Sequence, residues 1–191
     1  MATPHQGNWL ILKRLARYLI GAPSIVQSFN WQNVERSSCT FADSDWAGDK
    51  VSRKSTRCGM MFIGEHASKS CSSNQSTIAI SSAEAELHAL LKGASQSLGL
   101  RSMAADFGDV LKGSISCDAS AAIGIAHRQG LGKLRHVNVQ WLWIQSKVRD
   151  KEFKVSKVNG KDNPADMFTK HVCKDDIDKH TRFLNCYVVE G

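Results

Sequence analysis

Four acidic residues stand where predicted elements begin or end, and together they could do chemistry. Asp43 lies near the end of a predicted strand, Glu86 in the first turns of a long predicted helix, and Asp118 at the end of the next strand. Asp166 begins the helix after the last predicted strand. Converging carboxylates repel one another unless a cation joins them. Mg²⁺ prefers such oxygen ligands, and two ions about 3.5–4 Å apart suit in-line attack of water on a phosphodiester.

Any one of these acids by itself is more often a surface charge or a helix cap. Glu84 illustrates this, because Ser81 and Glu84 fit a capping box at the start of the long helix. Residues two apart on a helix point about 200° away from each other, so only one of Glu84 and Glu86 can face a site. Asp45 shares a strand face with Asp43 and is a candidate for an extra ligand. Spacing alone therefore leaves the metal hypothesis open.

The elements that would position these acids follow from hydrophobic periodicity and from capping residues. Helices are predicted over 9–19, 81–107, 120–127, 137–148 and 175–184, with a further helix that has Asn163 as its N-cap. Strands are predicted over 39–45, 58–63, 67–72, 114–117 and 153–158. Three strands come first along the chain, and helices and strands then alternate. This order indicates a mixed sheet with helices on its faces.

Composition bounds the class of protein. The chain has 191 residues, 42% of them apolar and 23% charged, which is typical of one globular domain. The longest near-candidate for a membrane span, residues 83–100, carries two glutamates, a histidine and a lysine. The polar residues 1–6 are not typical of a signal peptide. Lys and Arg number 25 against 18 Asp and Glu, and the net charge of +7 suggests a polyanionic partner.

The six cysteines form no CxxC pair, which favours reduced thiols in an intracellular protein. A zinc site from His171, Cys173, His180 and Cys186 is disfavoured, because their spacing is irregular and the segment is predicted to be helical.

Four motifs occur in a fixed order along the chain. They are 41–49 (FADSDWAGD) with 53–56 (RKST), 80–87 (ISSAEAEL), 117–123 (CDASAAI) and 163–170 (NPADMFTK). In this order they resemble the ribonuclease H domain of the Pol polyproteins of copia-type LTR retrotransposons. The segment 9–21 is similar to the piece that joins reverse transcriptase to ribonuclease H in those polyproteins.

The resemblance implies an α/β, ribonuclease H-like fold with a five-stranded mixed sheet, three antiparallel strands then two parallel, and helices on both faces. It implies an endonuclease that hydrolyses the RNA strand of RNA/DNA hybrids by two-metal-ion catalysis during retrotransposon reverse transcription. The metal-binding acids of the family fall on Asp43, Glu86, Asp118 and Asp166. These are the residues that the spacing had already picked. The expected cofactor is two Mg²⁺ ions, with Mn²⁺ as a substitute.

The resemblance also suggests contacts with the hybrid. Basic side chains would neutralise phosphates, and serines would contact the 2′-hydroxyls that distinguish RNA. The candidates are Ser44, Lys50, Arg53, Lys54, Arg57, Ser82, Ser120, Lys133 and Arg135. For each basic residue, a solvated surface charge is the equally good alternative. The family usually has an Asn-Gln pair where Ala119-Ser120 stand here, which weakens the expected contacts from that loop.

The resemblance divides the chain into three parts. Residues 1–37 would be a remnant of the reverse transcriptase-to-ribonuclease H connection (a basic amphipathic helix plus linker), 38–172 the ribonuclease H domain, and 173–191 a C-terminal helix and tail. The expected partners are an RNA/DNA hybrid and a reverse transcriptase domain upstream in the same polyprotein, with no membrane. The expected location is intracellular, in the cytoplasm and in virus-like particles.

Two rival functions belong to the same fold. A catalytically inactive ribonuclease H-like domain would bind hybrid or serve as a structural connection module, and the presence of all four acids argues against it. A transposase or integrase nuclease would carry its decisive glutamate last in the chain, whereas Glu86 is second among the four acids.

Overall fold

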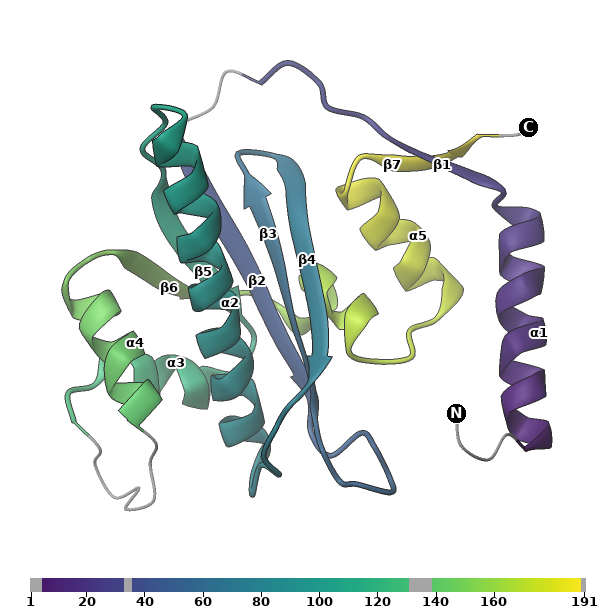
Figure 1. Ribbon diagram of the computed structural model, residues 1–191, viewed down its shortest axis with the longest axis horizontal. Coiled ribbons are helices and arrows are strands. Elements are labelled where there is room, and N and C mark those ends of the chain that lie inside the picture. Colours follow the sequence, from purple (N-terminus) through teal and green to yellow (C-terminus); the bar gives the residue numbers. More distant parts are fainter. Residues whose placement is uncertain (1–4, 33–35, 131–138, 190–191) are drawn as a thin grey trace.

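A five-stranded sheet forms the centre of the protein. The computed structural model describes residues 5–32, 36–130 and 139–189. The strands are β2 (Ser37–Asp45), β3 (Thr56–Ile63), β4 (His66–Asn74), β5 (Lys112–Cys117) and β6 (Phe153–Lys157), in the order β4-β3-β2-β5-β6 (Figure 1). Neighbours among β4, β3 and β2 run antiparallel, while β5 and β6 run parallel to β2. The predicted mixed sheet is confirmed.

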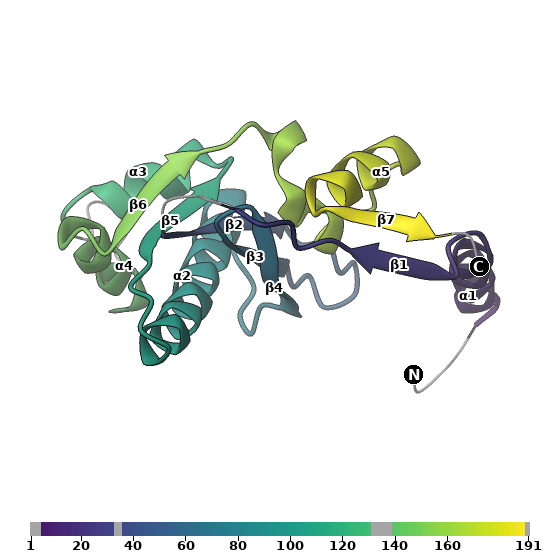
Figure 2. The ribbon, with the colours of Figure 1, turned by 90° about the horizontal axis from the view of Figure 1, so that it is seen from above.

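Helices cover both faces of this sheet. The described helices of the chain are α1 (Gln6–Gly21), which stands apart from the sheet, α2 (Ser82–Asp106), α3 (Ser120–His127), α4 (Val139–Arg149), α5 (Lys174–Phe183) and the short 3-10 helices η1 (Gly160–Asp162) and η2 (Pro164–Phe168). α2 packs on β2 and β3, and α3 and α4 pack on α2 and β6. Figure 2 shows α2 and α5 on opposite sides of the sheet. None of the described helices combines the length and apolar character that crossing a bilayer requires.

The alternation of side chains along β2 explains how both faces are filled. Thr40 and Ala42 face α2, where they meet Gly93. Phe41 points to the other face, and its ring lies 5.5 Å from that of Phe62 and 5.9 Å from that of Phe183 in α5. Because successive strand residues point to opposite faces, a single strand serves both layers.

α2 begins and ends as its sequence indicates. The hydroxyl of Ser81 accepts a hydrogen bond from the N–H of Glu84 (3.2 Å). The Glu84 carboxylate reaches back to the N–H of Ile80 (2.8 Å), one residue before the N-cap. At the other end Gly108 adopts a φ of +87°, where glycine is favoured, and it follows the C-cap Phe107.

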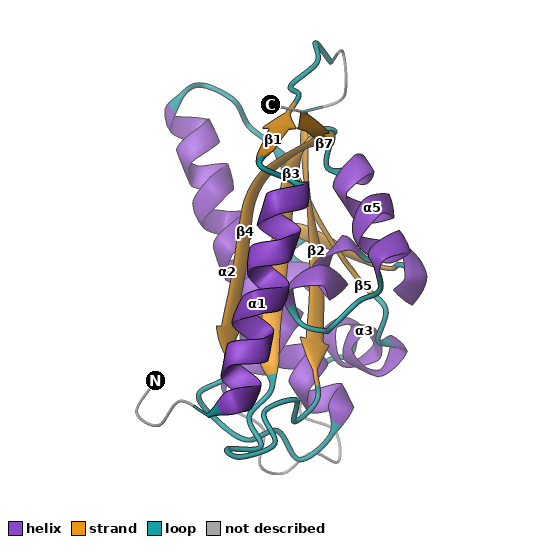
Figure 3. Cartoon of the chain, turned by 90° about the vertical axis from the view of Figure 1, so that its right-hand side faces the viewer, coloured by secondary structure: helices purple, strands orange, loops and turns teal. Residues whose placement is uncertain are grey.

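A short strand that follows α1 pairs with a short strand near the C-terminus, and the sequence did not indicate this pairing. β1 (Ser24–Gln27) and β7 (Cys186–Val189) form a separate antiparallel ribbon, although they were expected to be linker and tail. Figures 1 and 2 show this ribbon and α1 together at one end of the molecule, and Figure 3 is a view from that end with α1 in front of the sheet. The limits 1–37, 38–172 and 173–191 stay a prediction.

Candidate metal centre

Three of the predicted acids meet at one edge of the sheet. Asp43, Glu86 and Asp118 each offer a carboxylate oxygen, and these oxygens lie within 4.8 Å of one another. β2 and β5 are parallel neighbours with Phe41 opposite Ser116. Asp43 and Asp118, two residues further along, therefore emerge side by side. Glu86 reaches them from the first turns of α2.

Glu86 is held in a position that suits a cation. Its Oε2 is buried and has no hydrogen-bond partner among the described residues. Burial, with the charges of Asp43 and Asp118, raises the pKa of Glu86 to about 8. A buried carboxylate oxygen without a partner is unfavourable, and a metal ion would satisfy it. The donor set is made only of carboxylate oxygens, as hard divalent cations such as Mg²⁺ prefer, so the residues fit such an ion.

Asp166 joins this cluster through a lysine. Lys170 Nζ lies 3.0 Å from Oδ1 of Asp43 and 3.1 Å from Oδ1 of Asp166. Burial and the nearby Asp43 raise the pKa of Asp166 to about 6. Burial opposes the charge of Lys170, but Asp43 and Asp166 outweigh it and raise the pKa of the lysine. One ammonium group thus bridges the two acids and offsets part of their negative charge.

Thr169 and Lys170 belong to the motif 163–170, and the sequence did not indicate their contacts with Asp43. Besides the lysine contact, Asp43 accepts a hydrogen bond at Oδ2 from the hydroxyl of Thr169. Lys170 lies 127 residues from Asp43 along the chain, so no local pattern links them. The spacing of Asp166 and Lys170, four residues apart, is the one signal that could have suggested a pair.

η2 is anchored to the sheet by a buried asparagine. The Asn163 side chain is inaccessible to solvent, donates to the carbonyl of Ala42 (3.1 Å) and accepts from the N–H of Ala165 (3.2 Å). It caps η2, as predicted for the helix that starts there. The same side chain therefore fixes Asp166 beside β2.

Asp45 does not join the cluster. Its Oδ1 accepts a hydrogen bond from the N–H of Thr56, and its carboxylate lies where a side chain on Gly48 would have to be. Burial is the main cause that raises the pKa of Asp45. Asp45, which the sequence offered as an extra metal ligand, instead joins the two ends of the loop between β2 and β3.

The predicted serines take different positions. Ser44 is 5% exposed, and its hydroxyl donates to the carbonyl of Thr56 and accepts from Gln75, so it does not face a substrate. The Ser120 hydroxyl accepts a hydrogen bond from Lys157 (2.8 Å). Ser82 is exposed at the start of α2.

The predicted basic residues do not all point the same way. Lys50 and Arg53 are exposed in the β2–β3 loop, and Lys54 is partly buried there. Arg57 belongs to β3 and lines a groove on α2 instead. Lys133 and Arg135 lie outside the described residues.

Comparison with known proteins shows which sequences the chain is similar to. No protein-family model matches it. It is 29% identical over 191 residues to the retrovirus-related Pol polyprotein from transposon TNT 1-94 of Nicotiana tabacum, covering 95% of this chain and 14% of that one. The Pol polyprotein from transposon RE2 of Arabidopsis thaliana is 28% identical over 173 residues, which is 89% of this chain and 12% of the relative. The homologues of this chain are thus Pol polyproteins of copia-type retrotransposons. It spans only a small part of their length.

Solved structures show which fold the chain has. LC11-RNase H1, isolated from compost, superposes with a TM-score of 0.52 at 12% identity, over 76% of this chain and 98% of that one. The same protein in complex with an RNA/DNA hybrid gives a TM-score of 0.50 at 14% identity, over 75% and 98% of the two chains. The chain therefore has the ribonuclease H fold.

Proposed function

We propose that this chain is an endonuclease that hydrolyses the RNA strand of RNA/DNA hybrids with the help of divalent metal ions. The observation that carries the proposal is the triad of Asp43, Glu86 and Asp118, whose ligand oxygens lie within 4.8 Å of one another. The buried Oε2 of Glu86 has no hydrogen-bond partner in the described part of the chain. The hybrid as substrate is supported by the relationship to Pol polyproteins and by the solved complex of LC11-RNase H1 with a hybrid.

In this proposal Asp43, Glu86 and Asp118 hold one ion, and Asp166 completes the site of a second. Mg²⁺ suits these ligands, with Mn²⁺ as a substitute. Two such ions would supply a nucleophile from water at neutral pH and stabilise the leaving oxygen of the phosphodiester.

The chain's own residues prepare the site for these ions. Lys170 Nζ holds the negative charges of Asp43 and Asp166 in balance in the metal-free protein. Glu86, with its pKa of about 8, keeps a proton near neutral pH until a cation replaces that proton. Thr169 fixes the rotamer of Asp43 through its hydrogen bond, and Asn163 holds η2 beside β2.

The biological setting extends the same proposal. The Pol relatives support a reverse transcriptase domain upstream in the same polyprotein as partner, with residues 38–172 as the nuclease domain. They support an intracellular location, which we extend to the cytoplasm and to virus-like particles.

A cleavage assay tests the proposal. The protein is incubated with labelled RNA/DNA hybrid, double-stranded RNA or double-stranded DNA, in Mg²⁺ or in EDTA. We expect selective cutting of the RNA strand of the hybrid, abolished by EDTA and by Asp118→Asn or Glu86→Gln. Glu84→Gln is the matched control on the same helix and keeps the activity.

Two outcomes would contradict the proposal. Cutting that survives both Asp118→Asn and Glu86→Gln would overturn the assignment of the site. A folded protein that binds hybrid and never cuts it would favour the inactive, hybrid-binding module instead.

A further inference from the structure

One helix of this protein buries none of its apolar side chains. No residue of α1 is buried against the described part of the chain, and the helix stands apart from the sheet (Figure 1). Its large apolar side chains are 47–79% exposed, and they are Trp9, Leu10, Ile11, Leu12, Leu15, Tyr18, Leu19 and Ile20. An isolated helix of this length is only marginally stable in water, because helices in proteins are stabilised mainly by packing of an apolar face. The sequence of α1 therefore calls for a packing partner.

Apolar residues recur along α1 at the spacing of a helix–helix contact. Trp9, Leu12, Ala16 and Leu19 follow one another at intervals of three, four and three residues. Because successive helix residues are about 100° apart, these four side chains lie within an arc of about 80°. Intervals of three and four are the pattern by which two helices pack side by side. We call these four residues the α1 seam.

The charges of α1 lie off the α1 seam. Lys13, Arg14 and Arg17 occupy a separate arc of about 100°, so two seams can meet while these cations stay in solvent. Leu10 lies among the three cations and interrupts the polar side of the helix. A helix that lies on a lipid surface instead carries a strongly charged face opposite its apolar face. The pattern favours a protein partner over a membrane.

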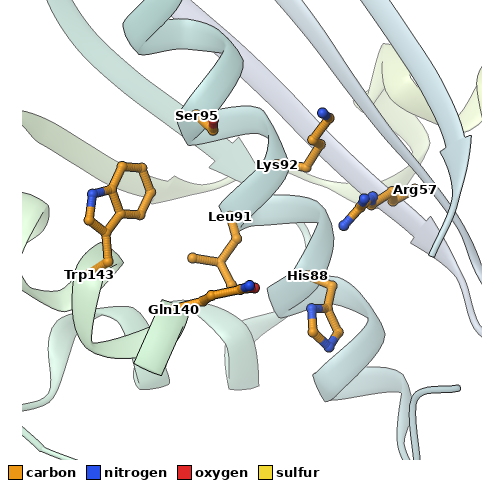
Figure 4. Close-up of a pocket in the computed structure, with 7 residues that line it drawn as sticks. All are labelled: Arg57, His88, Leu91, Lys92, Ser95, Gln140 and Trp143. Carbon is orange, nitrogen blue, oxygen red and sulfur yellow. The ribbon is translucent and has the colours of Figure 1, made fainter. Parts of the chain in front are cut away.

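The groove on α2 offers no comparable apolar surface. Figure 4 shows Arg57, His88 and Lys92 around Leu91 in that groove, so charged and polar side chains interrupt its apolar part. The α1 seam carries no charged residue. Its partner must therefore present an uncharged, apolar surface of similar length.

The β1–β7 ribbon enlarges the apolar surface next to α1. Two residues separate the end of α1 from β1, and the ribbon lies at the same end of the molecule as the helix (Figure 2). Its exposed apolar residues are Ile25, Val26, Tyr187, Val188 and Val189. With those of α1 they expose on the order of 1,000 Å², since a large side chain carries about 150–250 Å². The largest apolar patch of a typical monomer is about 300–600 Å², and each partner of a stable dimer contributes about 800 Å². The apolar surface is thus large enough for a dimer.

A second copy of α1 complements the first when the two helices run antiparallel. A two-fold axis near the middle of the helix places Leu12 opposite Ala16 of the partner subunit and Trp9 opposite Leu19 of the partner subunit. In each layer a larger side chain then meets a smaller one, which allows close packing without voids. The two-fold axis repeats each contact, so both copies bury the same patch.

We infer that this chain forms a two-fold symmetric dimer in which the α1 seams of two copies pack antiparallel, with the β1–β7 ribbons beside them. The occupant of the exposed face of α1 is a second copy of the chain. The inference does not depend on the proposed function, because α1 contains no acidic residue and none of the metal-binding candidates.

The mass of the full chain in solution tests the inference. Sedimentation equilibrium over a concentration series is expected to show reversible dimerisation with a dissociation constant in the micromolar range or below. Leu12→Glu/Leu19→Glu is expected to weaken dimerisation at least about 100-fold, because each dimer loses four buried leucines and gains four charges in the interface. Both leucines are exposed in the single chain, so this variant leaves the core intact.

A compensating pair of substitutions tests the antiparallel arrangement. Leu12→Ala leaves a gap opposite the partner's Ala16, and Ala16→Leu crowds the partner's Leu12, so each variant alone is expected to weaken dimerisation about 10-fold. Leu12→Ala/Ala16→Leu restores a leucine opposite an alanine and is expected to dimerise nearly as well as the wild type. Alanine and leucine both favour helix, so α1 itself is preserved.

A control outside α1 makes the result specific. Phe107→Ser/Val110→Ser removes two apolar side chains that are 86% and 77% exposed near the end of α2, and it is expected to dimerise like the wild type.

Three outcomes would overturn the inference. A wild type that stays monomeric throughout the series would mean that another polypeptide or a lipid surface covers α1. A dimer that persists in Leu12→Glu/Leu19→Glu would place the interface elsewhere, and failure of the compensating pair would exclude the antiparallel arrangement. Cleavage of hybrid is not measured in these experiments, so their result is independent of whether the chain is a nuclease.

Discussion

Lys170 Nζ lies 3.0 Å from Oδ1 of Asp43, whose side chain is fully buried. The same ammonium group lies 3.1 Å from Oδ1 of Asp166. A lysine therefore stands between two acids that the proposed function assigns to metal ions. A metal ion at these carboxylates would take over part of the charge compensation that Lys170 provides. The lysine should therefore contribute most to the free energy of unfolding in the metal-free protein.

Replacing Lys170 should reveal this exchange. We expect Lys170→Met to lower the free energy of unfolding in EDTA by about 1–2 kcal/mol, because it leaves the buried Asp43 carboxylate without its counter-ion. The loss stays this small because the ammonium group that is removed is partly exposed to solvent. In Mg²⁺ the loss should shrink, because the ion takes over the charge. Urea denaturation in both buffers measures the difference. Lys69→Met, at an exposed site without an ion pair among the described residues, is the control. Equal losses of Lys170→Met in EDTA and in Mg²⁺ would contradict the exchange.

Glu86 should make the metal-free protein less stable as the pH rises. Its pKa is about 8 in the folded chain against 4.5 for the free side chain, so the folded state holds the proton more tightly. The penalty is absent below about pH 4.5, grows as the pH rises and is complete above about pH 8. We expect Glu86→Gln to stabilise the protein in EDTA on the order of 3 kcal/mol at pH 9 and to change little at pH 4.

Thermal or urea unfolding of the wild type and Glu86→Gln at both pH values measures this effect. Glu84→Gln, whose position two residues earlier faces away from the acids, should show no such pH dependence. A constant difference between wild type and Glu86→Gln across the pH range would refute the assignment of the buried charge.

Metal binding should itself stabilise the fold. Mg²⁺ at 100 times its dissociation constant is expected to raise the free energy of unfolding by about 2.7 kcal/mol, because it binds the folded state alone. Asp118→Asn should remove most of this gain, since it takes one ligand from the triad. A Mg²⁺ series followed by urea denaturation measures it, and Asp109→Asn, an exposed acid outside the triad, keeps the response. The same Mg²⁺ dependence in wild type and Asp118→Asn would show that the ion binds elsewhere.

Two glycines of α2 should respond in opposite ways. A Cβ on Gly93 would lie 3.1 Å from Cγ2 of Thr40, whereas nothing lies within 4 Å of one on Gly99. We expect Gly93→Val to destabilise the protein by about 1–3 kcal/mol through overpacking against β2. Gly99→Ala should stabilise it by about 0.5–1 kcal/mol, because alanine favours the helix. Chemical denaturation of both variants and of the wild type measures these changes in the free energy of unfolding. A Gly93→Val protein as stable as the wild type would mean that α2 does not approach the sheet this closely.

Local chemistry explains why the sequence predicted most elements. The apolar run at 58–63, the Ser81 cap and the Asn163-Pro164 start are readable from neighbouring residues, and β3, α2 and η2 begin near them. Local patterns predict the strands but not their order in the sheet, because strand pairing joins residues far apart in the chain. The family resemblance supplied that order.

The pairing of β1 with β7 shows the limit of local reading. Ser24–Gln27 and Cys186–Val189 are four-residue segments with weak periodicity, and they form an antiparallel ladder with each other. Nothing near Ser24 in the chain indicates a partner at Val189.

The sequence by itself determined which acids the protein has and on which elements they stand. The tertiary structure alone decided their surroundings. It joins Asp43, Glu86 and Asp118 within 4.8 Å, turns Asp45 back to Thr56, and sets Lys170 between Asp43 and Asp166. The physical reason is that burial and charge act over a few ångströms in space, and here those distances separate residues up to 127 positions apart in the chain.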